Sequence, residues 1–292
     1  MGSRTTAAPR SNLASLVRLK YGSNIWDTLT PVALGTATAT ATCTDLEYTS
    51  TGKLVAAFGY GMGGTTVRVY TTSSPSTVTQ STGWTMGANY RPSNTLAIRS
   101  ELAAVGDIVY AVTVNTSSNT DSCYKSVDGG ATWTKQNSVI LPTGIGSGQG
   151  WYNQTLAVNP SNTNELISGG LDAYRSTDGG ATWQRVTYWV TTAPYLHADH
   201  HFMQWWNKNG ESRIVIGSDG GVFFRRDNGV SFVDKNRNLA IKQFYGGAIH
   251  PAAGSSYLIA GAQDNGNHQL KYPGLGPSNE VIGGDGAYVH IN

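Results

Sequence analysis

The sequence predicts an all-β fold in which four-stranded antiparallel sheets are arranged radially, a β-propeller. The main observation is a repeat, because Ser126-Val-Asp128-Gly-Gly-Ala-Thr-Trp133 returns 50 residues later as Ser176-Thr-Asp178-Gly-Gly-Ala-Thr-Trp183. Short β-type segments separate the two copies, and no stretch has the length and amphipathic pattern of a helix. A period of this length with such segments is typical of propeller blades.

Weaker copies of the repeat extend the series in both directions. Phe232, at the end of Arg226-Asp-Asn-Gly-Val-Ser-Phe, follows Trp183 by 49 residues. Trp84 precedes Trp133 by 49 residues, and Lys20–Trp26 is a still weaker copy. The sequence therefore predicts about five blades together with partial ones.

Each unit is expected to contain four strands, because short runs of β-branched and aromatic residues alternate with turn-forming Gly, Asn and Asp. In chain order the predicted strands are Thr44–Tyr48, Leu54–Phe58 and Thr66–Thr71; Thr95–Arg99, Ile108–Val114, Cys123–Ser126 and Trp133–Gln136; Tyr152–Asn159, Glu165–Ser168, Ala173–Ser176 and Trp183–Tyr188; Phe202–Trp206, Arg213–Gly217, Gly221–Arg225 and Phe232–Lys235; and Gln243–Ile249 and Tyr257–Gly261. Glu280–Ile291 is interpreted as the first strand of a further unit.

Both ends of the sequence fall inside a repeat. Residues 13–30 resemble the last two strands of a unit, whereas residues 280–292 resemble a first strand. Because a propeller closes to hide its sheet edges, either the two ends form one composite blade or further sequence, or a second chain, completes the ring. We expect residues 1–12 to be a disordered or processed N-terminal segment, residues 13–292 to be an incomplete propeller, and the complete ring to have six or seven blades.

The repeated motif suits a hairpin corner. Glycine accepts positive φ, the aspartate carboxylate can cap backbone N–H groups, and the tryptophan can cover the corner with apolar surface. The motif resembles the Asp-box, or BNR repeat, of sialidases, sortilin-type receptors and xyloglucan-cleaving glycosidases. This resemblance implies a structural role, away from the ligand face, for Ser126, Asp128, Gly130, Trp133, Ser176, Asp178, Gly180 and Trp183.

A second resemblance covers residues 145–292. It is carried, in this order, by Gly150-Trp-Tyr-Asn, His197-Ala-Asp-His-His201, Ser218-Asp-Gly-Gly221, Gln243-Phe-Tyr245, Gly261-Ala-Gln-Asp-Asn-Gly266 and Gly283-Gly-Asp-Gly286. The run is similar to secreted bacterial BNR-repeat, sortilin-like propeller proteins that are often labelled glycosyl hydrolase-like. That label is an analogy at the level of the fold and implies no particular reaction.

Composition excludes some classes of function and favours a location. The net charge is +2 with no basic run, so the electrostatic signature of a nucleic-acid binder is missing. No apolar stretch approaches the roughly 20 residues of a membrane span. Because only 13% of residues are charged, neutral hydrogen-bonding groups must keep the surface soluble, as in many extracellular β proteins. We therefore expect a secreted or cell-surface protein.

The two cysteines leave two possibilities open. Cys43 and Cys123 are either buried thiols or a single disulfide between neighbouring sheets, which an oxidising compartment would permit.

Propeller geometry brings several aspartates to one mouth of the central channel. The start of the first strand and the end of the second strand of each blade lie on the same face, opposite the repeated corners. Asp172, Asp219 and Asp264 follow second strands and belong to this face, where such equivalent positions indicate either a repeated turn or strut or a Ca²⁺ site. Four aspartates are candidates for a catalytic carboxylate pair, which needs a separation of about 5–5.5 Å for retaining glycosidases and about 6.5–9.5 Å for inverting ones: Asp199, Asp219, Asp264 and Asp285.

The same mouth collects candidate binding residues, because flat rings stack on sugars or anchor peptides and amides supply hydrogen bonds. These are Trp151, Tyr152, His197, His200, His201, Gln243, Tyr245 and Gln263. On an extended strand His197, Asp199 and His201 share one face and could hold a transition metal, or they could act as hydrogen-bonding struts or sugar contacts. No cofactor is certain, and Ca²⁺ held by aspartates is the other metal option.

The sequence favours a non-catalytic binding or assembly module whose mouth engages a glycan or a polypeptide. The alternative is a glycoside hydrolase or polysaccharide lyase that uses Asp and His groups at that mouth. A purely structural role in a larger surface assembly is a third possibility. Whether the protein is an enzyme is left open by the sequence.

Overall fold

The computed structural model of the chain describes residues 16–31, 42–59, 67–90, 97–190, 194–226, 231–237, 239, 242–274 and 276–291. A two-stranded sheet comes first, formed by β1 (Val17–Leu19) and β2 (Trp26–Thr28). Lys20–Ile25 forms the corner between these strands, as expected for the weakest copy of the repeat, with the Lys20 amide donating to the Ile25 carbonyl at 3.4 Å.

Five four-stranded sheets follow, and in each the strands pair antiparallel in chain order. They are β3 (Thr42–Tyr48), β4 (Leu54–Gly59), β5 (Arg68–Thr72) and β6 (Thr85–Met86); β7 (Ala97–Val105), β8 (Ile108–Asn115), β9 (Thr120–Ser126) and β10 (Thr134–Lys135); β11 (Thr155–Asn159), β12 (Asn162–Gly169), β13 (Ala173–Ser176) and β14 (Gln184–Arg185); β15 (His200–Lys208), β16 (Glu211–Ser218), β17 (Gly221–Arg226) and β18 (Val233–Asp234); and β19 (Phe244–Ile249), β20 (Leu258–Ala262), β21 (Asn267–Leu270) and β22 (Asn279–Ile282).

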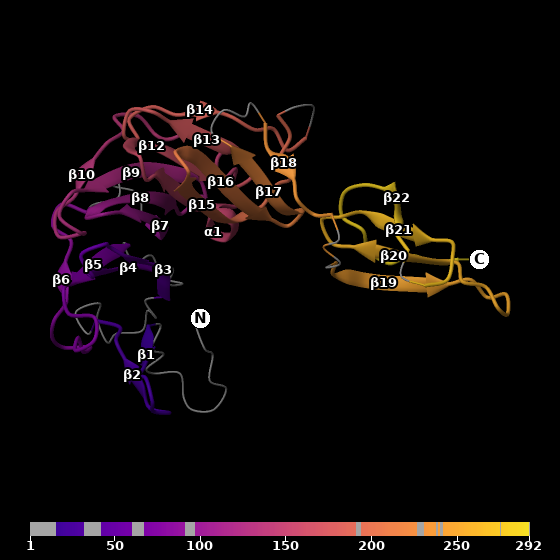
Figure 1. The fold of residues 1–292 in the computed structure, drawn as a ribbon, viewed down its shortest axis with the longest axis horizontal. Helices are drawn as coiled ribbons and strands as arrows, with labels where there is room; N and C mark the ends of the chain where they lie inside the picture. Colours follow the sequence, from indigo (N-terminus) through magenta and orange to yellow (C-terminus); the bar gives the residue numbers. More distant parts are fainter. Residues whose placement is uncertain are drawn as a thin grey trace.

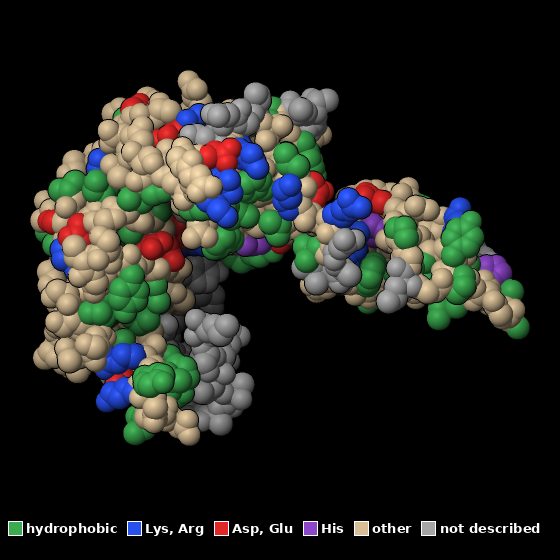
Figure 2. Space-filling view, viewed as in Figure 1, with side chains coloured by type: hydrophobic (Ala, Val, Ile, Leu, Met, Phe, Trp, Pro, Cys, Tyr) green, Lys and Arg blue, Asp and Glu red, His purple; other side chains and the backbone are tan. Residues whose placement is uncertain are grey.

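The sheets follow one another along a curved path, as the blades of a β-propeller do (Figure 1). The first strands β3, β7, β11 and β15 lie next to one another along the inner side of this curve. The last sheet, β19–β22, stands apart and joins the rest through a narrow connection (Figure 2). The predicted all-β propeller fold is therefore confirmed.

Two details of the predicted strands are corrected. The segment Glu280–Ile291 does not open a new sheet: Asn279–Ile282 is β22, the fourth strand of the last sheet, and Gln269 of β21 faces Asn279. Fourth strands such as β10 and β14 pair over only two residues, because Trp133 and Trp183 turn back onto the preceding corner instead of continuing the ladder.

The repeated corner has the same hydrogen bonds in both copies. In the first, the Ser126 hydroxyl donates to Asp128 Oδ1 at 2.7 Å, and Asp128 accepts from the Thr132 amide at 2.9 Å. The Trp133 indole N–H donates to the Gly130 carbonyl at 2.9 Å. Gly130 has a φ of 88°, which favours glycine. The corner is thus a turn closed by its own residues at the ends of β9 and β13, and in the first copy Lys53 and Thr71 of the preceding sheet also donate to its carbonyls.

Four apolar clusters pack neighbouring sheets against one another. One joins Val55 and Val69 to Leu102 and Trp133, a second joins Val112 to Leu166 in the following sheet, and a third joins Ile167 to Ile216 and Phe223. A fourth packs Leu16 and Leu29 against Phe58 of the next sheet. From β1 to β18, each sheet therefore buries apolar residues against its neighbour, as expected for a radial array.

The two cysteines are free thiols, so the predicted alternative of a disulfide is wrong. Cys123 on β9 faces the corner glycine Gly180 of the following sheet. Cys43 on β3 points to the Asp45 carbonyl of its own strand at 3.5 Å. The two sulfur atoms therefore face different neighbours, and burial raises the pKa of both thiols.

A helix with the length and hydropathy that a membrane span requires does not occur in the described part of the chain. The helix present, α1 (Gly150–Asn153), has one turn and leads into β11.

Candidate functional site

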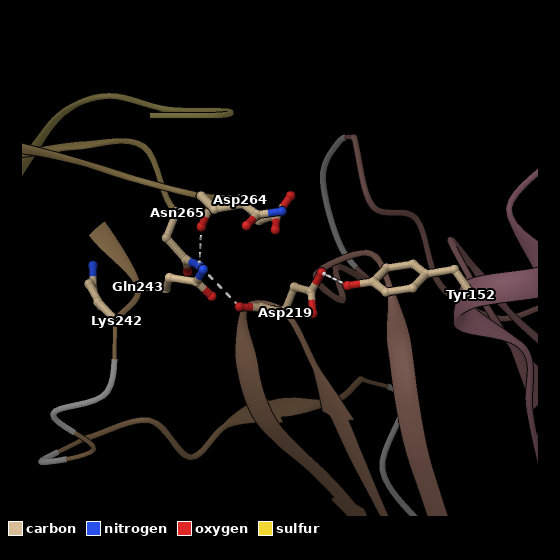
Figure 3. Close-up of a pocket in the computed structure, with 7 residues that line it drawn as sticks. Tyr152, Asp219, Lys242, Gln243, Asp264 and Asn265 are labelled. Carbon is tan, nitrogen blue, oxygen red and sulfur yellow. Dashed lines mark hydrogen bonds between the residues drawn. The ribbon is translucent and has the colours of Figure 1, made fainter. Parts of the chain in front are cut away.

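A cavity of about 470 Å³ lies where α1, the β16–β17 turn and the last sheet meet. Its lining is mostly polar: Tyr152 from α1, Asp219 from the β16–β17 turn, Lys242 and Gln243 preceding β19, and Gln263, Asp264 and Asn265 from the β20–β21 turn. Figure 3 shows the Tyr152 hydroxyl and the Asp219 carboxylate on one side and the amides of the last sheet on the other. Three consecutive sheets therefore contribute to one site.

Two polar contacts join the last sheet to the sheet before it. The Asn265 side-chain amide donates to the Asp219 carbonyl at 3.0 Å, and His197 Nε2 lies 2.9 Å from the Asp264 carbonyl oxygen. A third contact, from the Asp219 amide to the Asp199 carbonyl at 3.2 Å, fixes the two loops of the preceding sheet. Backbone carbonyls as well as side chains therefore hold together the mouth, the opening that contains this cavity.

Two side chains contact the Asp219 carboxylate, Tyr152 from α1 and His201 from β15. The Tyr152 hydroxyl donates to Asp219 Oδ2 at 3.1 Å, and His201 Nε2 lies 2.9 Å from Asp219 Oδ1. The rings of Tyr152 and His201 meet edge to face with centroids 4.6 Å apart. Desolvation, followed by the negative charge of Asp219, raises the pKa of the Tyr152 hydroxyl to about 12, so this hydroxyl remains a donor at neutral pH.

Asp264 has the most strongly perturbed carboxylate of the cavity. Desolvation, together with the charges of Asp219, Asp285 and Asp199, raises the pKa of Asp264 to about 6. One carboxylate oxygen of each of Asp199, Asp219 and Asp264 lies within 4.8 Å of the others. Crowding of like charges at such distances disfavours full ionisation. The cavity therefore holds a carboxyl that titrates just below neutral pH.

All four aspartates predicted as catalytic candidates come together. Asp199, Asp219 and Asp264 form the cluster, and Asp285 accepts from the Asp264 backbone amide at 3.1 Å. The expectation that second-strand ends converge fails for Asp172, because this buried carboxylate pairs with Arg185 and accepts from the Trp189 amide. Asp172 is a strut within its own sheet.

The predicted binding residues divide into four groups. Tyr152, Gln243 and Gln263 line the cavity. Trp151 lies beside Tyr152, with ring centroids 5.5 Å apart, and Tyr245 is exposed next to the lining. His197 and His201 contact Asp264 and Asp219, as described above. His200 is fully buried and neither of its ring nitrogens has a partner, so it lies away from the mouth.

The predicted metal-binding face of His197, Asp199 and His201 does not form. Asp199 has a φ of 58°, which interrupts the extended backbone, and β15 begins only at His200 and has a bulge before Phe202. The alternation that would place the three side chains on one face is therefore lost. Metal-ligand spacing in the described part of the chain is met by Asp199, Asp219 and Asp264 instead.

Three residues of the site were not predicted. Lys242 and Asn265 line the cavity, and the side-chain amide of Asn153 donates to Asp199 Oδ1 at 2.7 Å. Desolvation lowers the pKa of Lys242, whose ammonium nitrogen lies 2.7 Å from His268 Nε2. Asn153 and Asn265 stand within the motifs that begin at Gly150 and Gly261, which is the signal that could have identified them.

No model of a known protein family and no curated protein matches the chain. Among solved structures, it is similar to YCF48 bound to a D1 peptide, at 11% identity over 83% of this chain and 70% of that one, with a TM-score of 0.46. It is also similar to the GH74 enzyme of Niastella koreensis, at 17% identity and a TM-score of 0.47, covering 84% of this chain and 38% of the enzyme. A third similar structure is the GH32 β-fructofuranosidase of Bombyx mori, at 10% identity over 83% of this chain and 62% of that one, with a TM-score of 0.39. At these identities the likeness concerns the fold alone.

Proposed function

We propose that the chain is a propeller module that binds a polar ligand, a glycan or a polypeptide, in the cavity at its mouth. The observation that carries this proposal is the set of unused amides: within the described residues, neither the Gln243 nor the Gln263 side chain has a hydrogen-bond partner, although both line the cavity. Gln243 is exposed and Gln263 is half-buried, so both side-chain amides are open to solvent and free to hydrogen-bond to the hydroxyl or peptide groups of a ligand.

Exposed rings beside the cavity support the same proposal. Trp151 and Tyr152 from α1, and Phe244 and Tyr245 from β19, are all 40–50% exposed. Rings in such positions stack on sugar faces or pack against apolar side chains of a peptide. Together with the amides they provide the apolar surface and the directional polar groups of a typical ligand site.

A binding screen with matched variants tests this function. Glycan and peptide arrays would identify a ligand, and calorimetry would then compare wild type with Gln243→Ala, Gln263→Ala and Tyr152→Ala. We expect each variant to weaken binding about 3- to 30-fold, the loss of one or two hydrogen bonds or a stacked ring. Gln80→Ala, in a distant loop, is the control and should bind as wild type. Unchanged affinity in all three cavity variants would contradict the proposal.

The second candidate function is glycoside hydrolysis, with Asp264 as the proton donor and Asp219 as its partner carboxylate. It is favoured by the raised pKa of Asp264 and by the short distance between these carboxylates, because a protonated acid next to an ionised carboxylate is the arrangement that glycosidases use. Glycan cleavage that falls as the pH rises above about 6, and that is lost in both Asp264→Asn and Asp219→Asn, would establish it. Binding of intact oligosaccharide without cleavage would exclude it.

We further infer that the chain is an Asp-box propeller of the sortilin-like, BNR-repeat type, and that it is secreted or exported to the cell surface. The support is the matching set of hydrogen bonds in the corners at Asp128 and Asp178, together with a surface of few charges. Detection of the protein in culture medium, or its digestion by protease added to intact cells, tests this location. Recovery only from the lysate would argue against it.

A further inference from the structure

We propose that Asp199, Asp219 and Asp264, with the side chain of Asn153, form a calcium site at the floor of the mouth. This inference rests on the proposed function in one respect, since the ion would lie in the same cavity as the ligand. The ion would hold the loops around the cavity in place and would itself contact the ligand. Three sheets contribute to it, through α1, the β16–β17 turn and the β20–β21 turn.

The first observation is the geometry of the oxygens. One oxygen from each of the three carboxylates lies within 4.8 Å of the other two. Ca²⁺ binds oxygens at 2.3–2.6 Å, so ligand oxygens around it lie up to about 5 Å apart, whereas Mg²⁺ requires a tighter octahedron. The mutual distances of the three oxygens therefore fit the coordination sphere of one Ca²⁺.

The second observation is independent of the carboxylates and concerns Asn153. This residue is fully buried and its amide is directed at Asp199, to which Nδ2 donates at 2.7 Å. Its Oδ1, however, has no hydrogen-bond partner. Oδ1 and Nδ2 of an asparagine exchange places by rotation about one bond. With a cation present, rotation would turn the orphaned oxygen toward Asp199 and the ion.

The charges around the cluster also favour a cation. Among the described residues, the salt-bridge partner of these three aspartates is His201, which contacts Asp219. Lys242 lines the same cavity, but its ammonium nitrogen lies against the His268 ring. Asp285 adds a further negative charge next to Asp264. A divalent cation would relieve this repulsion, because oxygen ligands and negative charge are what hard cations select.

A bound Ca²⁺ would change what the mouth recognises. Protein oxygens would occupy one side of the ion, and the cavity would leave coordination positions open on the other. These positions accept hydroxyl, carbonyl or carboxylate oxygens of a ligand. A cavity lined by aspartates would thus gain direct coordination of ligand hydroxyls, and it would become able to bind anionic groups, which its negative charge otherwise repels.

Calorimetry on the full chain, first treated with chelator and then titrated with CaCl₂ at pH 7.5, tests this site. We expect one Ca²⁺ per chain with a Kd below about 1 mM, the range of calcium-binding proteins, and at least ten-fold weaker binding of Mg²⁺. Ca²⁺ should also raise the Tm, because the ion binds the folded state. The absence of a heat signal and of a Tm shift in wild type would overturn the proposal.

Variants locate the ion. Asp199→Asn should weaken Ca²⁺ binding at least ten-fold and Asn153→Leu at least three-fold, whereas Asp234→Asn, on β18 outside the cluster, should bind as wild type. A Tm measured in chelator shows whether each variant is folded. Terbium luminescence excited through the nearby Tyr152 and Trp151 gives a second readout, and Ca²⁺ should quench it by displacement. Equal Ca²⁺ affinity in wild type and in folded Asp199→Asn would overturn the assignment.

The outcomes separate this inference from the proposed function. Ligand binding by a chain that binds no Ca²⁺ would overturn the calcium site and leave the binding function intact. Ca²⁺ binding by a chain that binds no glycan or peptide would support the calcium site and contradict the proposed binding function.

Discussion

The middle sheets and the last sheet of this protein are held in different ways. In the middle, β8 and β11 are almost entirely buried, and apolar clusters bind each sheet to its neighbour. In the last sheet, every residue of β22 is exposed and so are four residues of β19, including Ile249 at 75%. Its described contacts with the preceding sheet are polar, from Asn265 and His197. The candidate site lies at this polar joint, so the best-packed part of the array and the candidate site are in different sheets.

The largest expected difference comes from one substitution made in both regions. Ile167→Ala, in the third apolar cluster, should lower the free energy of unfolding by about 2–5 kcal/mol, since it leaves a cavity in a close-packed core. Ile249→Ala removes the same atoms from an exposed position and should cost less than about 0.5 kcal/mol. Urea denaturation of both variants measures the difference. Comparable losses would show that the last sheet is packed against something in solution.

The repeated corners should be the next most sensitive positions. Asp178→Ala removes hydrogen bonds to the Thr182 amide and hydroxyl and to Ser176, and should cost about 1–3 kcal/mol. Burial would raise the pKa of Asp178, but these hydrogen bonds outweigh it and lower the pKa below 3.8. The corner's contribution is therefore present above pH 3.8 and is lost as the pH falls through the lowered pKa. Acid denaturation of Asp178→Ala beside Asp234→Ala tests both points.

Substitutions at the polar joint between the last two sheets should loosen the last sheet without unfolding the middle sheets. Asn265→Ala and His197→Ala each remove one contact worth about 0.5–1.5 kcal/mol. We expect faster amide hydrogen exchange in β19–β22 with little change in β7–β14, because the two regions would open separately. His250→Ala, which replaces a half-buried histidine between β19 and β20, is the control. Equal acceleration throughout the chain would mean that the array unfolds as one unit.

A smaller effect is expected from Glu101 on β7. Desolvation and the carboxylates of Asp45 and Glu47 outweigh the ion pair with Arg99 and raise the pKa of Glu101 to about 8. The folded state therefore holds a proton that the unfolded state releases near pH 4.5, and this carboxyl lowers stability as the pH rises from about 4.5 to about 8. Relative to wild type, Glu101→Gln should gain on the order of 1 kcal/mol between pH 5 and 8. Denaturation at both pH values measures it, and a parallel pH dependence would contradict it.

The thiols offer the mildest test. Cys123 is fully buried between two sheets, so it should resist alkylation in the native state, and both Cys43 and Cys123 should react once the chain is unfolded without reductant. Mass spectrometry after labelling distinguishes the cases. Failure of both thiols to react in denaturant would indicate a disulfide.

Much of the fold follows from the sequence alone. The 50-residue spacing of Trp133 and Trp183 and the Asp-Gly-Gly corners determined the blade repeat, because a hairpin corner is specified by its own residues. The grouping of Asp199, Asp219, Asp264 and Asp285 was also predictable, since a four-stranded meander places the ends of alternate strands on one face.

Only the tertiary structure decided the details of the site. The positive φ of Asp199 prevents His197, Asp199 and His201 from sharing one face. Asp172 pairs with Arg185 of its own sheet, and Cys123 packs against Gly180 and not against Cys43. Asn153 and Lys242 entered the site from other elements. Such choices depend on distances between segments that are far apart in the chain, and local sequence patterns specify the turn at each segment but not the neighbour that it meets.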